Sequence, residues 1–278
     1  MRSYPPAVRP VKTLRPRTPR AARAAEAPAV SAITLSVVVP IYNLSGALLD
    51  ETFEELSTFR RRHGRNAELV LVDDGSGPET AARLESFAKR SAGVLLLRNE
   101  QNRGKGHAVA RGLLESRGRL RVFTDADLAY PADEIDHIAA TLEAGHDVAI
   151  ACRVLPESRY VMSPAFFPYL YSRHVMSRIF NAAVRTTLIP DVLDSQAGLK
   201  GMTDAVARDV IPRLTISGFA FDVELLYCAH RRGYDIAQTP VLFRYDSEPS
   251  TMSFVRDAGS MLRDIARIRW NGALGRYA

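Results

Sequence analysis

The chain has 278 residues, of which 46% are hydrophobic, so it can build the core of one large domain or of two small ones. Its formal net charge of +6 lies entirely in residues 1–34, because acidic and basic side chains balance in the remainder. A neutral body disfavours nucleic acid as a partner, since a nucleic-acid-binding domain gathers basic groups on a folded face.

Residues 1–34 are rich in proline, alanine and arginine and lack apolar periodicity, which predicts a disordered basic tail. Three roles stay open for this tail: a solubilising extension, a contact with anionic lipid, or a transit sequence. No apolar run of about 18 residues predicts a membrane-spanning helix, and no secretory signal is recognisable. The two cysteines, Cys152 and Cys228, fit a reducing compartment. We expect a cytoplasmic protein, either free or peripheral at the cytoplasmic face of a membrane.

Strand and helix patterns alternate between residues 35 and 152. Short apolar runs predict strands at 35–40, 68–73, 94–98, 120–124 and 147–151. The stretches between them predict helices at 45–63, 78–91, 107–116 and 132–144. This order predicts an α/β fold with a Rossmann-like, mostly parallel sheet flanked by helices on both faces.

The alternation ends after residue 152. Residues 160–189 mix aromatic and apolar side chains with arginines, for example Phe166, Phe167 and Arg173. That composition predicts an amphipathic helix in a membrane interface, or else a helix packed on the edge of the sheet. The remaining patterns predict two helices, a strand and a final helix, near 203–211, 218–227, 236–245 and 251–269.

Two pairs of aspartates follow predicted strands. Asp125 and Asp127 occur in FTDADL, and Asp73 and Asp74 occur in VDDGSG. Ligands of parallel sheets bind beyond the carboxyl ends of the strands, so both pairs should face one crevice. Buried carboxylates need a cation or strong donors, and Mg²⁺ or Mn²⁺ prefers such oxygen ligands. Solvated turns remain the alternative for both pairs, and the second pair can also accept hydrogen bonds from a uracil or guanine base.

Two further motifs carry charge at predicted helix N-termini. NRGKGHAVARG places Lys105 between glycines, which suits an anion such as a diphosphate or a plain tight turn. GFAFDVELL places Asp222 and Glu224 in a first helical turn, where acids also oppose the helix dipole.

The order of the motifs is more specific than any one of them. VVVPIYN, VDDGS, NRGKG, FTDADL, DSQAGLKG and GFAFDVELLY follow one another between residues 37 and 227. In this the chain resembles family two of the inverting, nucleotide-sugar-dependent glycosyltransferases, which have the GT-A fold. Within that family it is most similar to the dolichyl-phosphate glucosyltransferases and their bacterial polyprenyl-phosphate relatives. The resemblance implies a single GT-A domain over 35–278, with a nucleotide-sugar half at 35–152 and an acceptor half at 153–278.

The resemblance also implies roles for individual residues. Those expected at the nucleotide sugar are Pro40, Tyr42, Asn43, Asp73, Asp74, Lys105 and Asp125. The metal ligands would be Asp127 and Asp125, with Asp127 the direct one. The catalytic residues beside the reacting sugar and the acceptor would be Asp194, Gln196, Asp222 and Glu224. The acceptor phosphate would be held by Arg153 and Arg173.

This sequence departs from the relatives at three of these motif positions. Ala129 stands where related mannosyltransferases have a glutamine metal ligand, so the metal is expected to depend more on the nucleotide. Ala197 and Leu199 replace the cysteine and phenylalanine of the glucosyltransferase motif, which leaves the acceptor less defined.

The reaction expected from the resemblance is inverting transfer of a hexose, glucose from UDP-glucose first, to a polyprenyl or dolichyl phosphate with Mg²⁺ or Mn²⁺. A soluble small-molecule acceptor and a mannosyltransferase that uses GDP-mannose stay open as alternatives. A nucleotide-sugar-binding protein without catalysis is disfavoured, because Lys105, Asp125, Asp127 and Asp194 are all present. The expected partners are therefore the nucleotide sugar, a lipid phosphate or small acceptor and a membrane surface, without nucleic acid.

Overall fold

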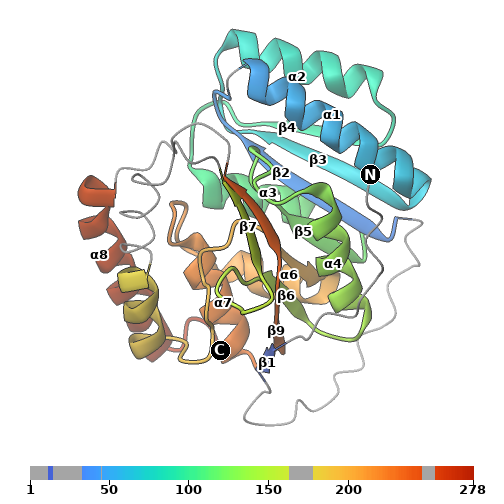
Figure 1. Cartoon of the computed structure of the whole chain (residues 1–278). Helices are drawn as coiled ribbons and strands as arrows, with labels where there is room; N and C mark the ends of the chain where they lie inside the picture. The colour runs from blue at the N-terminus through green and yellow to red at the C-terminus, as the bar shows by residue number, and fades with distance from the viewer. Residues whose placement is uncertain (1–11, 15–32, 45, 163–177, 246–253) are drawn as a thin grey trace.

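The computed structural model describes residues 12–14, 33–44, 46–162, 178–245 and 254–278 (Figure 1). An eight-stranded sheet with the order β1-β9-β6-β8-β5-β2-β3-β4 forms the centre. Its parallel half consists of β2 (Leu35–Ile41), β3 (Ala67–Asp73), β4 (Val94–Arg98) and β5 (Leu120–Phe123). The strands end within a residue or two of the positions that their apolar runs predict.

Helices cover both faces of the sheet, because neighbouring residues of its buried strands point to opposite sides. Val37 and Val39 pack in one core and Val38 in the other. The first core is closed by α1 (Gly46–His63), α2 (Pro78–Arg90) and α4 (Ala132–Glu143). The second is closed by α3 (Lys105–Glu115), α6 (Asp204–Val210), α7 (Phe221–Arg231) and α8 (Phe254–Ala273). This arrangement confirms the predicted fold class.

The second half of the chain completes the same sheet. β6 (Val148–Ala151) pairs in parallel with β9 (Ile236–Thr239), and β8 (Lys200–Thr203) lies antiparallel between β5 and β6. The sequence did not predict β8, because a four-residue KGMT segment has no apolar run and its pairing comes from its two neighbours. Both halves therefore share one sheet.

Two segments differ from the expected pattern. The strand predicted at 236–245 divides at Pro240, which has no N–H group for a ladder, into β9 and β10 (Leu242–Tyr245). β10 pairs in parallel with β7 (Arg159–Met162) in a separate two-stranded sheet. Within the segment expected to be a disordered tail, β1 (Lys12–Leu14) pairs antiparallel with β9, so that expectation is wrong for these three residues.

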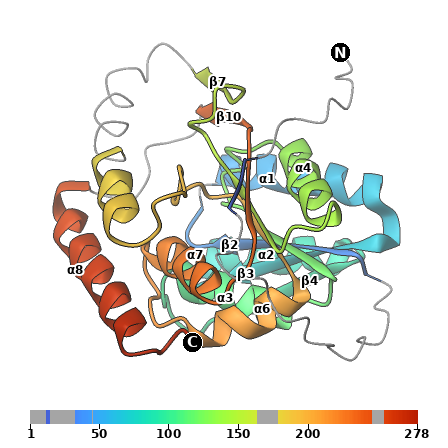
Figure 2. The same ribbon diagram turned by 90° about the horizontal axis from the view of Figure 1, so that it is seen from below.

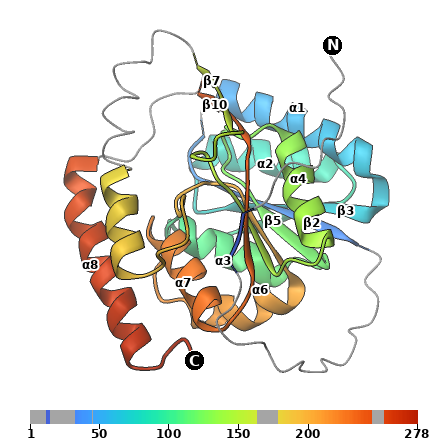
Figure 3. The same ribbon diagram turned by 60° about the horizontal axis from the view of Figure 1, so that its bottom comes forward.

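The last helix lies at the edge of the molecule (Figures 2 and 3). α8 contacts α7, which separates it from the sheet. Among the helices that the structure describes, none combines the length and the apolar character needed to cross a bilayer. Half of the predicted amphipathic segment at 160–189, including Phe166, Phe167 and Arg173, falls outside the described residues. Its described ends are the strand residues 160–162 of β7 and the helical residues 178–187.

Candidate active site

Asn43 joins the loops that follow β2 and β3. Its backbone has a φ of 45°, in the left-handed region that asparagine tolerates better than most residues. Its N–H group donates to Ser76 Oγ at 3.0 Å, and its Oδ1 accepts from the Gly77 N–H at 2.8 Å. Tyr42, the preceding residue, is exposed, and Pro40 lies within β2. The first motif therefore shapes the loops beyond the carboxyl ends of β2 and β3.

Asp73 and Asp74 are buried at the end of β3 and hold the neighbouring loops. The Asp74 carboxylate accepts from the Gly104 N–H at 2.8 Å and from Asn99 Nδ2 at 2.6 Å. Asp73 accepts from the Ser76 N–H at 2.8 Å and lies 3.3 Å from Arg98 Nε. Each carboxylate can accept further bonds, so contact with a base or ribose stays a prediction. Asp74 has a second function in any case, because it fixes the loop that enters α3.

The glycines beside Lys105 allow close packing at the start of α3. Gly104 has a φ of 95°, and a Cβ on Gly106 would lie 2.6 Å from the Cβ of Phe221 in α7. The Gly106 N–H donates to the Ser217 carbonyl at 2.8 Å, and the Gly104 N–H belongs to Asp74. These two amides are thus occupied within the chain, so a diphosphate at this motif would have to be bound by other groups, of which the Lys105 side chain is one.

Four charged side chains from separate elements form a row of alternating sign, and we call them the charge row: Lys200, Asp222, Lys105 and Asp125. Lys105 Nζ lies 2.6 Å from Asp125 Oδ1 and 3.7 Å from Asp222 Oδ2. Lys200 Nζ, fully buried in β8, lies 2.6 Å from Asp222 Oδ1 and also donates to the Ala197 carbonyl. The row brings together residues from β8, α7, α3 and the loop after β5.

The charges of the row control each other's ionisation. Burial alone would lower the pKa of Lys105, but the negative charges of Asp125 and Asp222 outweigh it and raise that pKa. For Lys200 burial dominates and lowers the pKa, although Asp222 opposes the change. A side chain at Gly198 would collide with this arrangement, because its Cβ would lie 1.9 Å from Asp125 Oδ2. Glycine at this position of the DSQAGLKG motif therefore allows the Asp125 carboxylate to approach closely.

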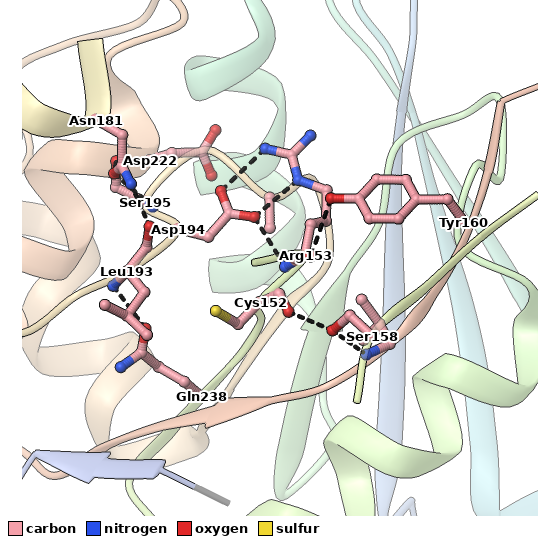
Figure 4. Close-up of polar contacts among 12 residues, drawn as sticks. Cys152, Arg153, Ser158, Tyr160, Asn181, Leu193, Asp194, Ser195, Asp222 and Gln238 are labelled. Carbon is pink, nitrogen blue, oxygen red and sulfur yellow. Dashed lines mark hydrogen bonds and ion pairs between the residues drawn. The ribbon is translucent and has the colours of Figure 1, made fainter. Parts of the chain in front are cut away.

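Arg153 and Asp194 form a forked ion pair beside the row (Figure 4). Arg153 Nε donates to Oδ2 at 2.7 Å, Nη2 to Oδ1 at 2.9 Å, and the Arg153 N–H to Oδ2 at 3.0 Å. Burial raises the pKa of Asp194, yet the charge and hydrogen bonds of Arg153 lower it overall. Tyr160 Oη donates to the Arg153 carbonyl at 2.9 Å, so β7 braces the pair. The remaining guanidinium N–H groups of Arg153 can still bind an anion.

Glu224 is a core side chain, which does not support the catalytic role predicted for it. Its side chain is fully buried under α7, where its two oxygens accept four hydrogen bonds. The donors are the N–H groups of Thr215 and Ile216 at 2.8 Å, Thr215 Oγ1 at 2.8 Å and Tyr277 Oη at 2.5 Å. An acid in the first turn of a helix can face the core, which the sequence motif does not reveal. Glu224 is a positioning residue for the loop that meets Gly106.

Asp125 and Asp127 lie on the turn that leaves β5, where Leu128 has a φ of 44° and its N–H donates to the Asp125 carbonyl at 3.2 Å. Asp127 Oδ1 accepts from the Ala129 N–H at 3.1 Å. The described part of the chain holds no cluster of three or more side chains able to hold a metal ion. The pair nevertheless fits a divalent cation, because Asp125 already has a positive group, Lys105, at its oxygen. Most of the coordination shell would come from ligand oxygens and water.

Of the two remaining predicted site residues, Gln196 and Arg173, the structure describes only Gln196. Gln196 is half-buried on the segment between Asp194 and β8. Arg173 lies outside the described residues. Sequence reasoning missed Lys200 as a member of the charge row, although the DSQAGLKG motif contains it; the burial of this lysine in β8 is visible only in the structure.

The model of glycosyl transferase family 2 matches residues 36–188. The chain belongs to this family. It is 32% identical over 254 residues to the dolichyl-phosphate beta-glucosyltransferase of Dictyostelium discoideum, across 88% of this chain and 77% of the relative. The dolichyl-phosphate beta-glucosyltransferase of Saccharomyces cerevisiae is 30% identical over 257 residues, with the same two shares. These matches confirm the resemblance that the motifs indicated.

Solved structures show the same fold. Glucosyl-3-phosphoglycerate synthase from Mycobacterium tuberculosis in complex with UDP has a TM-score of 0.60 and 21% identity, across 88% of this chain and 80% of that one. Its complex with Mn²⁺, UDP-glucose and glycerol 3-phosphate has a TM-score of 0.56 and 20% identity, with the same coverage. At 20–21% identity, the similarity of this chain to these solved structures establishes the fold alone.

Proposed function

We propose that the chain transfers glucose from UDP-glucose to a polyprenyl phosphate of the dolichyl type, with inversion at the sugar carbon. The sugar and the acceptor are suggested by the dolichyl-phosphate beta-glucosyltransferases that it resembles over most of its length. The nucleotide sugar would bind to the half at 35–152, beside Asn43, Asp73 and Asp74. The acceptor would approach from the half at 153–278.

One observation favours a phosphate over an alcohol as the acceptor. Each acid predicted to be catalytic already has a strong partner: Asp194 has Arg153, Asp222 has two lysines, and Glu224 has four donors. A carboxylate held by cations is a poor general base. An alcohol needs a base at neutral pH, whereas a phosphate monoester is already largely ionised, with a second pKa of about 6. The site thus suits a nucleophile that brings its own negative charge.

The cations of the site would orient the two reactants. Asp127 and Asp125 would hold Mg²⁺ or Mn²⁺ together with diphosphate oxygens, and this ion supplies charge neutralisation to the leaving nucleoside diphosphate. Lys105 would leave Asp125 and contact the diphosphate instead. The free N–H groups of Arg153, with Arg173, would hold the acceptor phosphate opposite the diphosphate. Placing both reactants accounts for a large part of the rate in such displacements.

The proposal is tested by supplying the purified chain with radiolabelled UDP-glucose or GDP-mannose, in Mg²⁺, Mn²⁺ or chelator. A short-chain polyprenyl phosphate and the matching polyprenol serve as paired acceptors, since they differ only in the phosphate. We expect label from UDP-glucose in the phosphate lipid, with metal, and none in the polyprenol. Transfer from GDP-mannose would overturn the choice of donor, and transfer to the alcohol or to neither lipid would overturn the choice of acceptor.

A further inference from the structure

α8 has an apolar inner face and a second apolar row that faces outward. Met261, Ile265 and Ile268 are buried towards the body of the protein. Outside this buried face, Leu262 is 60% exposed, Trp270 is 66% exposed, and Leu274, directly after the helix, is 55% exposed. One apolar face suffices to dock a helix on a protein core. The second face therefore needs another explanation.

The outward residues form a continuous stripe. Leu262, Ala266, Trp270 and Leu274 are spaced four apart, so they follow one another along the same side of the helix, and all four are exposed. We call this set the outer stripe. Figure 3 shows α8 along the outer edge of the molecule. Single exposed apolar residues are common on protein surfaces, but a contiguous row marks a contact surface.

Arginines flank the outer stripe. From Gly259 to the end of the chain the charged side chains are Arg263, Asp264, Arg267, Arg269 and Arg276. A helical period places Arg263 and Arg267 along one side of the stripe and Arg269 along the other. Arg269 Nη1 also donates to the Thr187 carbonyl at 2.6 Å, which ties α8 to the adjacent helical residues 178–187. The surface is thus apolar along its centre and positive at its margins.

We infer that α8 is the surface by which this chain binds a bilayer that contains anionic lipid. Leucine and tryptophan enter the boundary between head groups and acyl chains, while arginine stems lie along the apolar surface and their charges reach lipid phosphates. A second copy of the chain is a poorer occupant, because a symmetric α8 contact would set arginines against arginines. The inference rests on α8 alone and differs from the earlier expectation, which placed the membrane contact at 160–189.

The place of α8 in the fold suits this role. It packs on α7, whose first turn carries Asp222 of the charge row. The helix therefore belongs to the side of the molecule proposed to receive the acceptor. A bilayer bound there would lie along the acceptor half and leave the β2–β4 half, which holds the nucleotide loops, towards solvent.

Trp270 is the only tryptophan of the chain, so its fluorescence reports on the outer stripe directly. The full chain, without nucleotide sugar, is titrated with vesicles of phosphatidylcholine alone or mixed with phosphatidylglycerol. We expect a shift of the emission to shorter wavelength and protection from iodide quenching with the anionic vesicles, both weakened by high salt. An unchanged emission while the protein co-sediments with vesicles would assign the contact to another surface and overturn the inference.

Variants then test the two chemical components by co-sedimentation. Leu262→Glu with Leu274→Glu should weaken binding at least about tenfold, because burying even one leucine is worth more than that factor. Arg263→Glu should weaken binding to anionic vesicles about fivefold or more. Leu114→Glu and Arg65→Glu, at exposed positions on other elements, are the matched controls and should bind normally.

Failure of this inference and of the proposed function can be told apart. Vesicle binding is measured without substrate, and transfer to a short-chain acceptor in detergent is measured without vesicles. Binding with no transfer would refute only the proposed reaction. Transfer in detergent with no binding to either vesicle would refute only the role of α8. A dimer that the double glutamate variant converts to monomer, with no vesicle binding, would show that the stripe joins two copies instead.

Discussion

The ammonium group of Lys105 lies 2.6 Å from the Asp125 carboxylate, at the position where a divalent cation is expected to bind. The two residues come from the start of α3 and from the turn after β5. A lysine this close competes with a metal ion for the same oxygen. The competition ends if a diphosphate arrives and draws the ammonium away, so metal and nucleotide sugar should bind cooperatively.

Removing the competitor should therefore separate metal binding from catalysis. Lys105→Gln should raise the affinity for Mn²⁺ without nucleotide by about tenfold, since a charge-assisted hydrogen bond is worth roughly 1.5–3 kcal/mol. The same variant should bind UDP more weakly and transfer sugar more slowly. Electron paramagnetic resonance of free Mn²⁺ measures the first effect, with Lys89→Gln, an exposed lysine of α2, as the control. Weaker Mn²⁺ binding by Lys105→Gln than by the wild type would refute the competition.

Asp127 should be needed for transfer and dispensable for folding. Asp127→Ala should lower transfer by roughly a thousandfold, because metal ions contribute several kcal/mol of charge stabilisation. Its thermal midpoint should stay within about 2 °C of the wild type, since Asp127 is only partly buried and has a minor part in packing. The exposed Asp133→Ala serves as the control for loss of a carboxylate. Transfer near the wild-type rate at saturating donor and metal would remove Asp127 from the metal site.

Removing the positive charge of the buried Arg153–Asp194 pair should lower the free energy of unfolding strongly. Arg153→Met leaves the Asp194 carboxylate without its partner and should cost about 3–5 kcal/mol of unfolding free energy at pH 7. The surface variant Arg119→Met should cost little. Unfolding in urea measures both.

The same pair fixes the sign of a pH effect. In the wild type Arg153 lowers the pKa of Asp194, so its contribution to stability is full above the ordinary aspartate pKa of about 3.9 and is lost as the pH falls through the lowered value. In Arg153→Met the lowering by Arg153 is lost and only the charge of Lys200 still opposes burial, so the pKa of Asp194 should rise relative to the wild type. The deficit of the variant should then be larger at pH 7 than at pH 4. An equal deficit at both values would show that the pair does not control the ionisation of Asp194.

Glu224 should affect stability and leave the reaction nearly unchanged. Glu224→Gln keeps the shape but loses charge-assisted acceptance from Thr215, Ile216 and Tyr277, which should cost about 1–3 kcal/mol. The kcat of the folded variant should fall by no more than a few fold. Tyr277→Phe, which removes one of the four donors, should show a smaller change in the same direction. A loss of kcat by a hundredfold with unchanged stability would return Glu224 to the catalytic group.

The sequence predicted the strands of the first half well because each is a short apolar run closed by a turn. Val37–Val39 and Leu69–Val72 are buried on both faces, so composition alone marks them. The sequence did not indicate β8, because Lys200–Thr203 lacks an apolar run of its own and is held as a strand by pairing with β5 and β6. β1 escaped for the same reason, since Lys12–Leu14 gains its ladder only from β9.

The sequence predicted which residues belong to the candidate site better than it predicted which of their side chains contact one another. Motif order predicted Asp125, Asp194 and Asp222 at one site. In the structure Lys105 links Asp125 to Asp222, whereas Asp194 pairs with Arg153. It could not say that Asp222 lies between two lysines or that Glu224 turns inward, because both depend on which way α7 is rotated. A helix of which almost every residue is buried has no polar face from which that rotation can be read.

The last prediction separates the two kinds of acceptor through Asp222. If the acceptor is a phosphate, no side chain has to remove a proton, and Asp222 serves to hold Lys105 and Lys200 in place. Asp222→Asn should then lose less than the factor of about 10²–10⁴ that a general base contributes. The pH dependence decides more sharply than the rate alone. With a polyprenyl phosphate, kcat/KM of wild type and variant should fall together below about pH 6, where the acceptor phosphate takes up its second proton. A general base would instead add a pKa of the enzyme to the wild-type profile, and Asp222→Asn would remove it. Two profiles that coincide after scaling support the phosphate acceptor; a limb present only in the wild type refutes it.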